Sequence, residues 1–338
     1  MSDERKDSAD QIDLAYEEGE LLHGRVIKAL SGFFTVDGEK GPIIAQLPGR
    51  LKKERKDTDI VAVGDWVTAL VNEDGTGTIE EVAERESVLS RTRPVARDGR
   101  RLSADREQVL VANPDQVVIV FSIKKPRPSL RKLDRFLVVA EMNDLPVIIT
   151  VNKVDLLDPA AEVSSSEAHE MFRLYEDLGY RTIYTSAKSG EGIQELSDAL
   201  KDKISVMTGS SGVGKSSLLN AIQPGLGLRV NEVSEATEKG LHTTRHAEMF
   251  PLDEGGYVVD TPGIRGLALF DIEPTELDAY FREIASLVEQ CRFSDCSHRH
   301  EPGCAVRAAV EDGRISEERY DSYLRLREEH EQLEDDLF

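Results

Sequence analysis

Short stretches of alternating apolar and polar residues dominate the chain between residues 21 and 90. Residues 24–36 are rich in β-branched and aromatic side chains, and Asp37-Gly38 is typical of a tight hairpin turn. Two further stretches of this kind cover residues 63–71 and 77–82. About five short strands in so few residues predict a small β-barrel, and we expect that barrel to be an OB-fold.

From about residue 112 the apolar residues come in continuous runs instead. Residues 116–121 and 146–151 are runs of the kind found in strands that are buried on both faces of a parallel sheet. Other strands are expected at 181–185, 204–208 and 257–260, and helices at 130–142, 166–178 and 191–202. Strands that alternate with helices predict a doubly wound α/β domain, which we place at residues 112–270.

The remaining segments differ in composition from these two domains. Residues 1–20 contain eight acidic and two basic residues, which is typical of a disordered tail. Residues 91–111 are expected to form a basic linker between the barrel and the α/β domain. Residues 271–338 are expected to form a mostly helical domain, which contains all three cysteines of the chain.

Composition narrows the class of protein. The chain has 42 Lys and Arg against 64 Asp and Glu, a net charge of −22, which argues against a wholly basic RNA coat protein. It contains no apolar run long enough to span a membrane, and three cysteines in 338 residues do not make a disulfide scaffold. We therefore expect a cytoplasmic protein with no membrane partner.

One glycine-rich loop carries the strongest chemical signal. Residues 209–216 match the pattern G-x-x-x-x-G-K-[ST] between a predicted strand and a predicted helix, where backbone N–H groups would cradle a polyphosphate. Lys215 would neutralise the β- and γ-phosphates, and Ser216 would coordinate Mg²⁺. The expected phosphate-binding residues are Gly209, Ser210, Ser211, Gly212, Val213, Gly214, Lys215, Ser216 and Ser217.

Three further motifs point to a guanine nucleotide. Asp260-Thr-Pro-Gly263 follows a strand, so Asp260 can hold Mg²⁺ and Gly263 can offer its N–H to a γ-phosphate. Asn152-Lys153-Val154-Asp155 also ends a strand. Asn152 could hydrogen-bond the N7/O6 edge of a purine, and the Asp155 carboxylate would pair with the two donors that guanine has and adenine lacks. Ser186-Ala187-Lys188 ends the next strand and could offer a backbone N–H to guanine O6.

These motifs resemble the signature of translation-factor-class GTPases, but they occur in a different order. N-K-V-D and S-A-K precede the glycine-rich loop here, whereas they follow it in the usual order. We interpret this as a circular permutation, which the fold tolerates because all of these loops emerge at one edge of the sheet. The permutation also joins the Asp260 loop directly to the C-terminal domain.

The permuted order, the barrel before it and the cysteines behind it resemble the small ribosomal subunit biogenesis GTPase A (RsgA) family. This resemblance covers residues 21–325 and implies that residues 239–244 are switch I. Thr244, or else Thr243, would then contact Mg²⁺ and the γ-phosphate. Ile264 stands where many GTPases have a water-orienting Gln, and the resemblance assigns that role to His242. The alternative for His242 is an exposed loop residue.

The C-terminal domain contains a candidate metal site. Cys291, Cys296, His298 and Cys304 lie within 14 residues, and three thiolates with one imidazole make a structural Zn²⁺ site. The resemblance supports this assignment. His300 is an alternative fourth ligand, and free thiols without a metal are the other alternative.

Three basic segments oppose the acidic background, at residues 50–56, 91–106 and 124–135. Each could be a solvated surface, but together with an OB-fold they favour contacts with RNA phosphates. Trp66, the only tryptophan, is expected in the barrel core, with a base-stacking platform as the alternative.

These features predict a Mg²⁺-dependent GTPase that binds GTP and GDP. The resemblance implies a 30S ribosomal subunit and its 16S rRNA as partners, late maturation of that subunit as the process, and release upon hydrolysis. We expect the protein to act as a monomer. The alternatives are a permuted GTPase that acts on tRNA or another assembly, and a non-enzymatic RNA-binding module gated by nucleotide.

Overall fold

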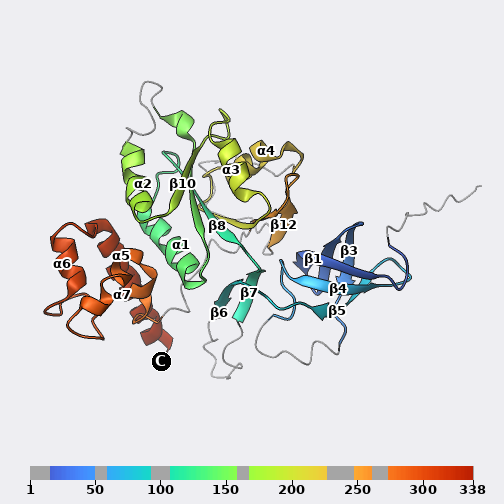
Figure 1. The fold of residues 1–338 in the computed structure, drawn as a ribbon, viewed down its shortest axis with the longest axis horizontal. Coiled ribbons are helices and arrows are strands. Elements are labelled where there is room, and N and C mark those ends of the chain that lie inside the picture. The colour runs from blue at the N-terminus through green and yellow to red at the C-terminus, as the bar shows by residue number, and fades with distance from the viewer. Residues whose placement is uncertain are drawn as a thin grey trace, which may run out of the picture.

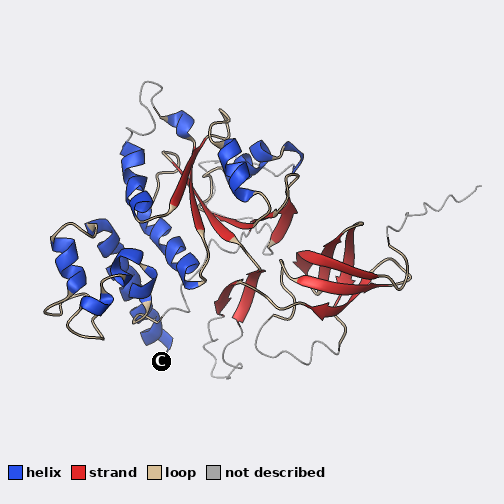
Figure 2. Ribbon diagram, in the orientation of Figure 1, coloured by secondary structure: helices blue, strands red, loops and turns tan. Residues whose placement is uncertain are grey.

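The computed structural model describes residues 16–49, 59–92, 107–157, 167–226, 247–260 and 273–337. These form a barrel, a central sheet covered by helices, and a C-terminal group of helices (Figure 1). Figure 2 shows the barrel as all strand and the C-terminal part as helical. The described strands are β1 (Leu21–Leu30), β2 (Phe33–Gly38), β3 (Gly41–Gln46), β4 (Trp66–Val71), β5 (Gly77–Val82), β6 (Val88–Thr92), β7 (Glu107–Ala112), β8 (Gln116–Ser122), β9 (Val147–Asn152), β10 (Arg181–Thr185), β11 (Ile204–Thr208), β12 (Glu248–Pro251) and β13 (Tyr257–Asp260). The described α-helices are α1 (Leu130–Met142), α2 (Glu167–Asp177), α3 (Ile193–Leu200), α4 (Lys215–Ile222), α5 (Arg282–Ala285), α6 (Ala305–Glu311) and α7 (Glu317–Leu337), and short 3-10 helices include η6 (Leu277–Tyr280).

The first five strands close into a barrel. Neighbouring strands follow the order β1-β2-β3-β5-β4, and β4 pairs back with β1. Alternate residues of each strand point inward, and Val26, Val36 and Ile79 are completely buried among them. This confirms the predicted five-stranded barrel with the strand order of an OB-fold.

The prediction that Trp66 belongs to the barrel core is wrong. Trp66 is 48% exposed, whereas Val67, Ala69 and Val71 of the same strand are buried. Because side chains alternate between the two faces of a strand, these three small residues fill the barrel and Trp66 must point outward.

The central sheet has the order β10-β9-β8-β11-β13-β12. The first five strands are parallel, and β12 pairs with β13 in the antiparallel direction. Leu133 of α1 and Phe172 of α2 pack on one face, while Leu196 of α3 and Leu218 of α4 pack on the other. The doubly wound arrangement is therefore confirmed, and its apolar strands are buried on both faces as the continuous runs indicate.

A buried arginine attaches the C-terminal helices to the central domain. The Arg319 guanidinium of α7 donates to the Asp134 carboxylate of α1 at 2.6 Å and to both carboxylate oxygens of Glu283 at 2.6 and 3.0 Å. Tyr175 of α2 also donates to Asp134, at 2.7 Å. All four side chains are almost fully buried, so this network fixes α7 against the outer surface of α1 and α2.

The barrel joins the central sheet at one edge. β1 pairs with β12 through Lys28 and Glu248, whose side chains form an ion pair at 2.8 Å. The Tyr257 hydroxyl donates to the Asp37 carboxylate at 3.1 Å nearby.

The two ends of the predicted basic linker, residues 91–111, belong to strands. They are parts of β6 and β7, which pair with each other in the antiparallel direction as a separate two-stranded sheet.

None of the described helices has the length and apolar composition that crossing a bilayer requires.

Candidate functional site

Four of the predicted motifs meet at the carboxyl edge of the parallel sheet. N-K-V-D follows β9, S-A-K follows β10, the glycine-rich loop follows β11, and Asp260 ends β13. The register pairs Thr185 with Asn152 and Met207 with Asp260, so the strands end at the same height. Loops that follow parallel strands in this way form the ligand crevice of doubly wound sheets. The sheet thus brings together segments that lie over 100 residues apart in the chain.

The glycine-rich loop has a backbone that only glycine adopts readily. Gly209 and Gly214 have φ angles of 140° and 100°. A Cβ on Gly209 would lie 2.2 Å from the Val120 carbonyl oxygen, and one on Gly214 would lie 2.3 Å from the Asn152 amide nitrogen. The loop therefore packs directly on the neighbouring strand and on the N-K-V-D motif, which explains the two glycines at its ends.

Lys215 stands at the first turn of α4, immediately after this loop. Its ammonium donates to the carbonyl oxygens of Gly209 at 2.8 Å and Ser210 at 3.1 Å. The side chain therefore folds back across the loop, over the backbone groups that would face a polyphosphate. This is the position from which a lysine neutralises β- and γ-phosphates in P-loop enzymes.

Asn152 holds the two halves of the site together. It is 1% exposed, and its amide group donates to the Val213 carbonyl at 2.8 Å. Its carbonyl oxygen accepts from the Ala187 N–H at 3.3 Å and from the Thr185 hydroxyl at 3.4 Å. The sequence predicts a purine contact for this residue; the structure gives it a bridging role between three loops that the sequence does not reveal.

Lys153 extends along the same loop. It has a positive φ of 67°, and its ammonium donates to the Gly212 carbonyl at 2.6 Å and the Lys125 carbonyl at 2.5 Å. Burial lowers the pKa of Lys153, although the nearby Asp155 carboxylate opposes this shift. Val154, the next residue, is 4% exposed and anchors the motif in the core.

Asp155 is oriented by the neighbouring S-A-K loop. The Ser186 hydroxyl donates to one carboxylate oxygen at 2.7 Å, and the Lys188 ammonium lies 4.0 Å from the other. The Asp155 side chain is 19% exposed, so the carboxylate is partly accessible. Each carboxylate oxygen has two lone pairs, so the Ser186 contact leaves both oxygens able to accept, as the recognition of two adjacent N–H donors requires.

Several predicted residues lie outside the described part of the chain. These are His242, Thr243, Thr244 and Gly263. Asp260 is described only as the last residue of β13, beside the start of the glycine-rich loop. The first basic segment, residues 50–56, and most of the second, residues 91–106, also lie outside it.

The third basic segment is partly engaged within the fold. Arg131 lies 3.8 Å from Asp321, and Arg135 pairs with Glu329, both on α7. The Lys124 ammonium donates to the Leu156 carbonyl at 3.0 Å. Lys125, Arg127 and Lys132 remain exposed. The acidic C-terminal helix therefore neutralises part of the charge that the sequence assigns to RNA.

The three cysteines and His298 converge as the candidate metal site. One potential ligand atom from each of the four residues lies within 4.8 Å of every other. The Cys291 and Cys304 sulfurs are 4.0 Å apart, and His298 Nδ1 lies 3.6 and 3.4 Å from them. A tetrahedral Zn²⁺ site would separate its ligand atoms by about 3.5–3.8 Å, so these residues fit the ion. His300 is exposed and is not part of this group.

Outer contacts determine which histidine nitrogen faces the cysteines. His298 Nε2 lies 3.1 Å from the Asp278 carboxylate, so Nδ1 is left for a metal. The Tyr320 hydroxyl donates a hydrogen bond to the His298 carbonyl oxygen at 2.5 Å. Burial raises the pKa of the Cys296 thiol to about 12, so a bound cation would be needed to deprotonate it at neutral pH. No motif spacing marks Asp278, which precedes Cys291 in the separate segment η6.

Comparisons with known proteins match about nine tenths of this chain. Residues 82–270 match the family model of the RsgA GTPase, and residues 23–79 match that of the RsgA N-terminal domain. A Thermotoga maritima protein named small ribosomal subunit biogenesis GTPase RsgA is 43% identical over 305 residues, which cover 90% of this chain and 95% of that protein. A protein of the same name from Gemmatimonas aurantiaca is 43% identical over 309 residues, covering 90% of this chain and 96% of that protein.

Two solved structures are similar over nearly their full length. The crystal structure of YjeQ from Thermotoga maritima has a TM-score of 0.73 and 41% identity, and the match covers 92% of this chain and 99% of that one. The structure of YloQ, described as a circularly permuted GTPase, has a TM-score of 0.69 and 33% identity, with 94% and 97% covered. The circular permutation that the motif order predicts therefore has a solved counterpart in a similar chain.

Proposed function

Because this chain belongs to the RsgA family of circularly permuted GTPases, we propose that it binds the 30S ribosomal subunit and assists its late maturation. The chain is a GTP-hydrolysing enzyme, as its family and structural relatives show. The observation that carries the proposal is the convergence of the glycine-rich loop, N-K-V-D and S-A-K at one sheet edge, in a chain whose relatives are named for small-subunit biogenesis.

Guanine is selected by the Asp155 carboxylate in this proposal. The Ser186 hydroxyl donates to one of its oxygens, which orients the carboxylate and leaves both oxygens able to accept further hydrogen bonds. The adjacent N1–H and amino group of guanine then face an acceptor that adenine cannot satisfy, and a buried acceptor left unpaired costs about 1–3 kcal/mol. Asn152 supports this pocket indirectly, because it ties the S-A-K loop to the glycine-rich loop.

The polyphosphate is bound by the backbone of the glycine-rich loop and by Lys215. Ser216 and Asp260 would hold a Mg²⁺ ion, because a hydroxyl and a carboxylate are the oxygen ligands that Mg²⁺ prefers. The strand that leads into the glycine-rich loop, β11, pairs with β13, which ends at Asp260. That ion supplies positive charge against the phosphates when it is bound. Ser210 and Ser211 lie within the same loop and Ser217 follows it. All three belong to the proposed nucleotide site, as do Thr243, Thr244 and Gly263.

His242 is the proposed water-orienting residue. Its support is the family resemblance together with the apolar Ile264 at the usual position of that group. A positioned histidine would align the water for attack on the γ-phosphate and accept its proton.

The cysteine cluster completes the proposal as a structural zinc site. Its ligands would be Cys291, Cys296, His298 Nδ1 and Cys304, and the four-coordinate set leaves no open position for a reaction. A bound zinc ion would cross-link a loop that has few apolar residues. Arg319 of α7 in turn attaches the C-terminal helices to Asp134 of α1.

The proposed partner is the 16S rRNA of the 30S subunit, and the proposed location of the protein is the cytoplasm. GTP-bound protein docks on 16S rRNA as a monomer, and hydrolysis relaxes the switch segments and releases it. The three thiols form no disulfide, which suits a reducing cytoplasm.

Co-sedimentation with isolated ribosomal subunits tests this function. The full chain is mixed with 30S or 50S subunits in GDP or in a non-hydrolysable GTP analogue. We expect retention on 30S subunits with the analogue, and little retention with GDP or on 50S subunits. Equal retention on 30S subunits with GDP and with the analogue would favour a non-enzymatic RNA-binding module. Absence of 30S binding would favour a GTPase that acts on tRNA or another assembly.

A further inference from the structure

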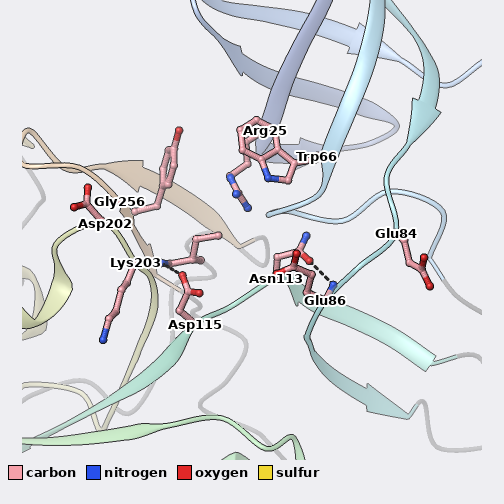
Figure 3. Close-up of a pocket in the computed structure, with 11 residues that line it drawn as sticks. Arg25, Trp66, Glu84, Glu86, Asn113, Asp115, Asp202, Lys203 and Gly256 are labelled. Atoms are coloured by element: carbon pink, nitrogen blue, oxygen red, sulfur yellow. Dashed lines mark hydrogen bonds between the residues drawn. The ribbon is translucent and has the colours of Figure 1, made fainter.

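A cavity of about 290 Å³ separates the barrel from the central sheet (Figure 3). Arg25 and Trp66 line it from the barrel, and Asn113, Asp115, Ile204 and Tyr257 line it from the other side. The strands β8, β11 and β13 begin here, whereas their opposite ends carry the nucleotide loops. The cavity is therefore distinct from the GTP site, and its volume is near the lower end of small-ligand pockets.

The upper wall of this cavity is an arginine stacked on an exposed tryptophan. The Arg25 guanidinium carbon lies 4.3 Å from the centre of the Trp66 ring and 5.8 Å from that of Tyr257. Figure 3 shows the guanidinium pointing into the cavity beneath the indole. Trp66 is 48% exposed, although exposing a large indole to water is less favourable than burying it. The stacked pair presents a flat surface that a second ring could extend.

Arg25 has hydrogen-bond donors that the described residues do not satisfy. Among the described residues, Nη1 alone finds an acceptor, the Gly64 carbonyl at 2.9 Å, and the buried Nε has no hydrogen-bond partner. No carboxylate among the described residues forms a salt bridge with it, and burial lowers its pKa. A half-buried guanidinium with unmet donors indicates a ligand that offers acceptors.

The opposite wall carries polar groups that are held in place. The Asp115 carboxylate accepts the Ile204 N–H at 2.6 Å. The Asn113 amide donates to the Gly64 carbonyl at 3.1 Å and accepts the Glu86 N–H at 2.8 Å. Both side chains are thus held by hydrogen bonds to backbone groups, in positions that do not need to reorganise on binding.

The charged side chains that line the cavity exclude a phosphate group and a cationic side chain as its ligand. Glu84, Glu86, Asp115 and Asp202 line the cavity, while the Lys203 ammonium turns away to the Gln116 side chain at 3.3 Å. A phosphate group would meet more negative than positive charge, and a cationic side chain would lie against Arg25. A neutral planar ring with donors and acceptors on its edge satisfies both walls and stacks on the aromatic surface.

We propose that this cavity binds one unpaired nucleobase of an RNA strand. The base stacks beside the Arg25–Trp66 pair, accepts from Arg25, and donates its amino or imino hydrogen to Asp115. The proposal rests on the proposed function only for the source of the base, namely RNA. It uses the base-stacking alternative for Trp66 that its exposure supports.

Intrinsic fluorescence tests this directly, because Trp66 is the only tryptophan. Full-length protein saturated with GDP, so that the GTP site is filled, is titrated with a single-stranded hexaribonucleotide. We expect a saturable change in Trp66 emission that the same sequence in a duplex does not produce. Adenosine monophosphate should bind more weakly than the strand; equal affinity would overturn RNA as the source.

Variants separate the cavity from the rest of the barrel. Arg25→Gln should weaken the strand's affinity by about 5- to 100-fold, the range that one stacked and hydrogen-bonded base contributes. Trp66→Ala, followed by anisotropy of a labelled strand, should give a similar loss. Phe33→Ala is the matched control, since Phe33 is also an exposed barrel aromatic, at 49%, but does not line the cavity.

Two results would overturn the proposal. One is unchanged strand affinity in folded Arg25→Gln and Trp66→Ala proteins, as judged by circular dichroism. The other is a Trp66 response to an arginine-rich peptide but not to RNA, which would make the cavity a cation site. Neither result involves ribosomal subunits, so 30S-dependent GTP hydrolysis would still be measured independently.

Discussion

The Asn152 side-chain amide donates to the carbonyl oxygen of Val213 at 2.8 Å, so the guanine motif holds the phosphate loop directly. Its other end accepts from the backbone of Ala187, at 3.3 Å. The two loops that we propose to read the base and the loop that we propose to bind phosphate therefore share one buried side chain. This bridge joins residues 61 positions apart in the chain.

Asn152→Ala should weaken nucleotide binding, although the variant keeps the Asp155 carboxylate that we propose to contact guanine. The change leaves the Val213 carbonyl unpaired, at a cost of about 1–3 kcal/mol, and frees the phosphate loop. We expect a lower melting temperature and at least a tenfold loss of GTP affinity, measured by calorimetry. Thr185→Val is the control, because it loses only the 3.4 Å contact to Asn152 and should change affinity less. Equal effects of the two variants would contradict the bridging role.

Asp155→Asn should exchange guanine for xanthine preference. The amide replaces one acceptor by a donor, and xanthine supplies the complementary carbonyl. Affinity for GTP should fall and affinity for xanthosine triphosphate should rise in the same titration. Ser186→Ala, which removes only the hydroxyl that orients Asp155, should weaken GTP binding without any gain for xanthosine triphosphate. A variant that still strongly prefers GTP would show that Asp155 does not read the base.

Elemental analysis should find about one zinc ion per chain in protein that is purified without chelators. Cys296→Ser should lose that zinc and lower the stability of the C-terminal helices, while GTP affinity stays within a few-fold. His300→Ala should retain zinc, because His300 is exposed and lies outside the ligand group. Wild-type protein with no zinc would refute the site, and zinc loss in His300→Ala would reassign the fourth ligand.

His242→Ala should be a catalytic variant with nearly normal binding. Loss of a water-positioning group is expected to slow hydrolysis by about 10²–10⁴-fold, by analogy with other positioned acid–base groups. GTP affinity should stay within a few-fold of wild type, and the variant should remain longer on the small subunit. Single-turnover hydrolysis provides the comparison. Equal rates for the variant and wild type would return His242 to an exposed loop residue.

Much of the fold follows from the sequence because strong patterns act locally. The run 116–121 predicts β8 (Gln116–Ser122), and the helix expected at 130–142 has the bounds of α1. The sequence also predicts which loops share the sheet edge in spite of the permuted motif order, since that edge depends on strand direction and not on chain order. Domain boundaries stay a prediction.

Other features arise only from tertiary packing. Trp66 looks like a core residue because it is large and apolar, yet strand alternation turns it outward. Asp278 and Arg319 gain their roles from residues that are distant in the chain, His298 and Asp134, so no local spacing could reveal them. The same is true of Asn152, whose bridge to Val213 exists only once β9 and β11 are placed in one sheet.

The most direct test of the account is single-turnover GTP hydrolysis with and without purified 30S subunits. Wild-type protein should hydrolyse GTP slowly alone and much faster with 30S subunits, while 50S subunits and free tRNA have little effect. Asp155→Asn should show the same 30S stimulation only with xanthosine triphosphate. A hydrolysis rate that 30S subunits leave unchanged would contradict the claim that this GTPase acts on the small ribosomal subunit.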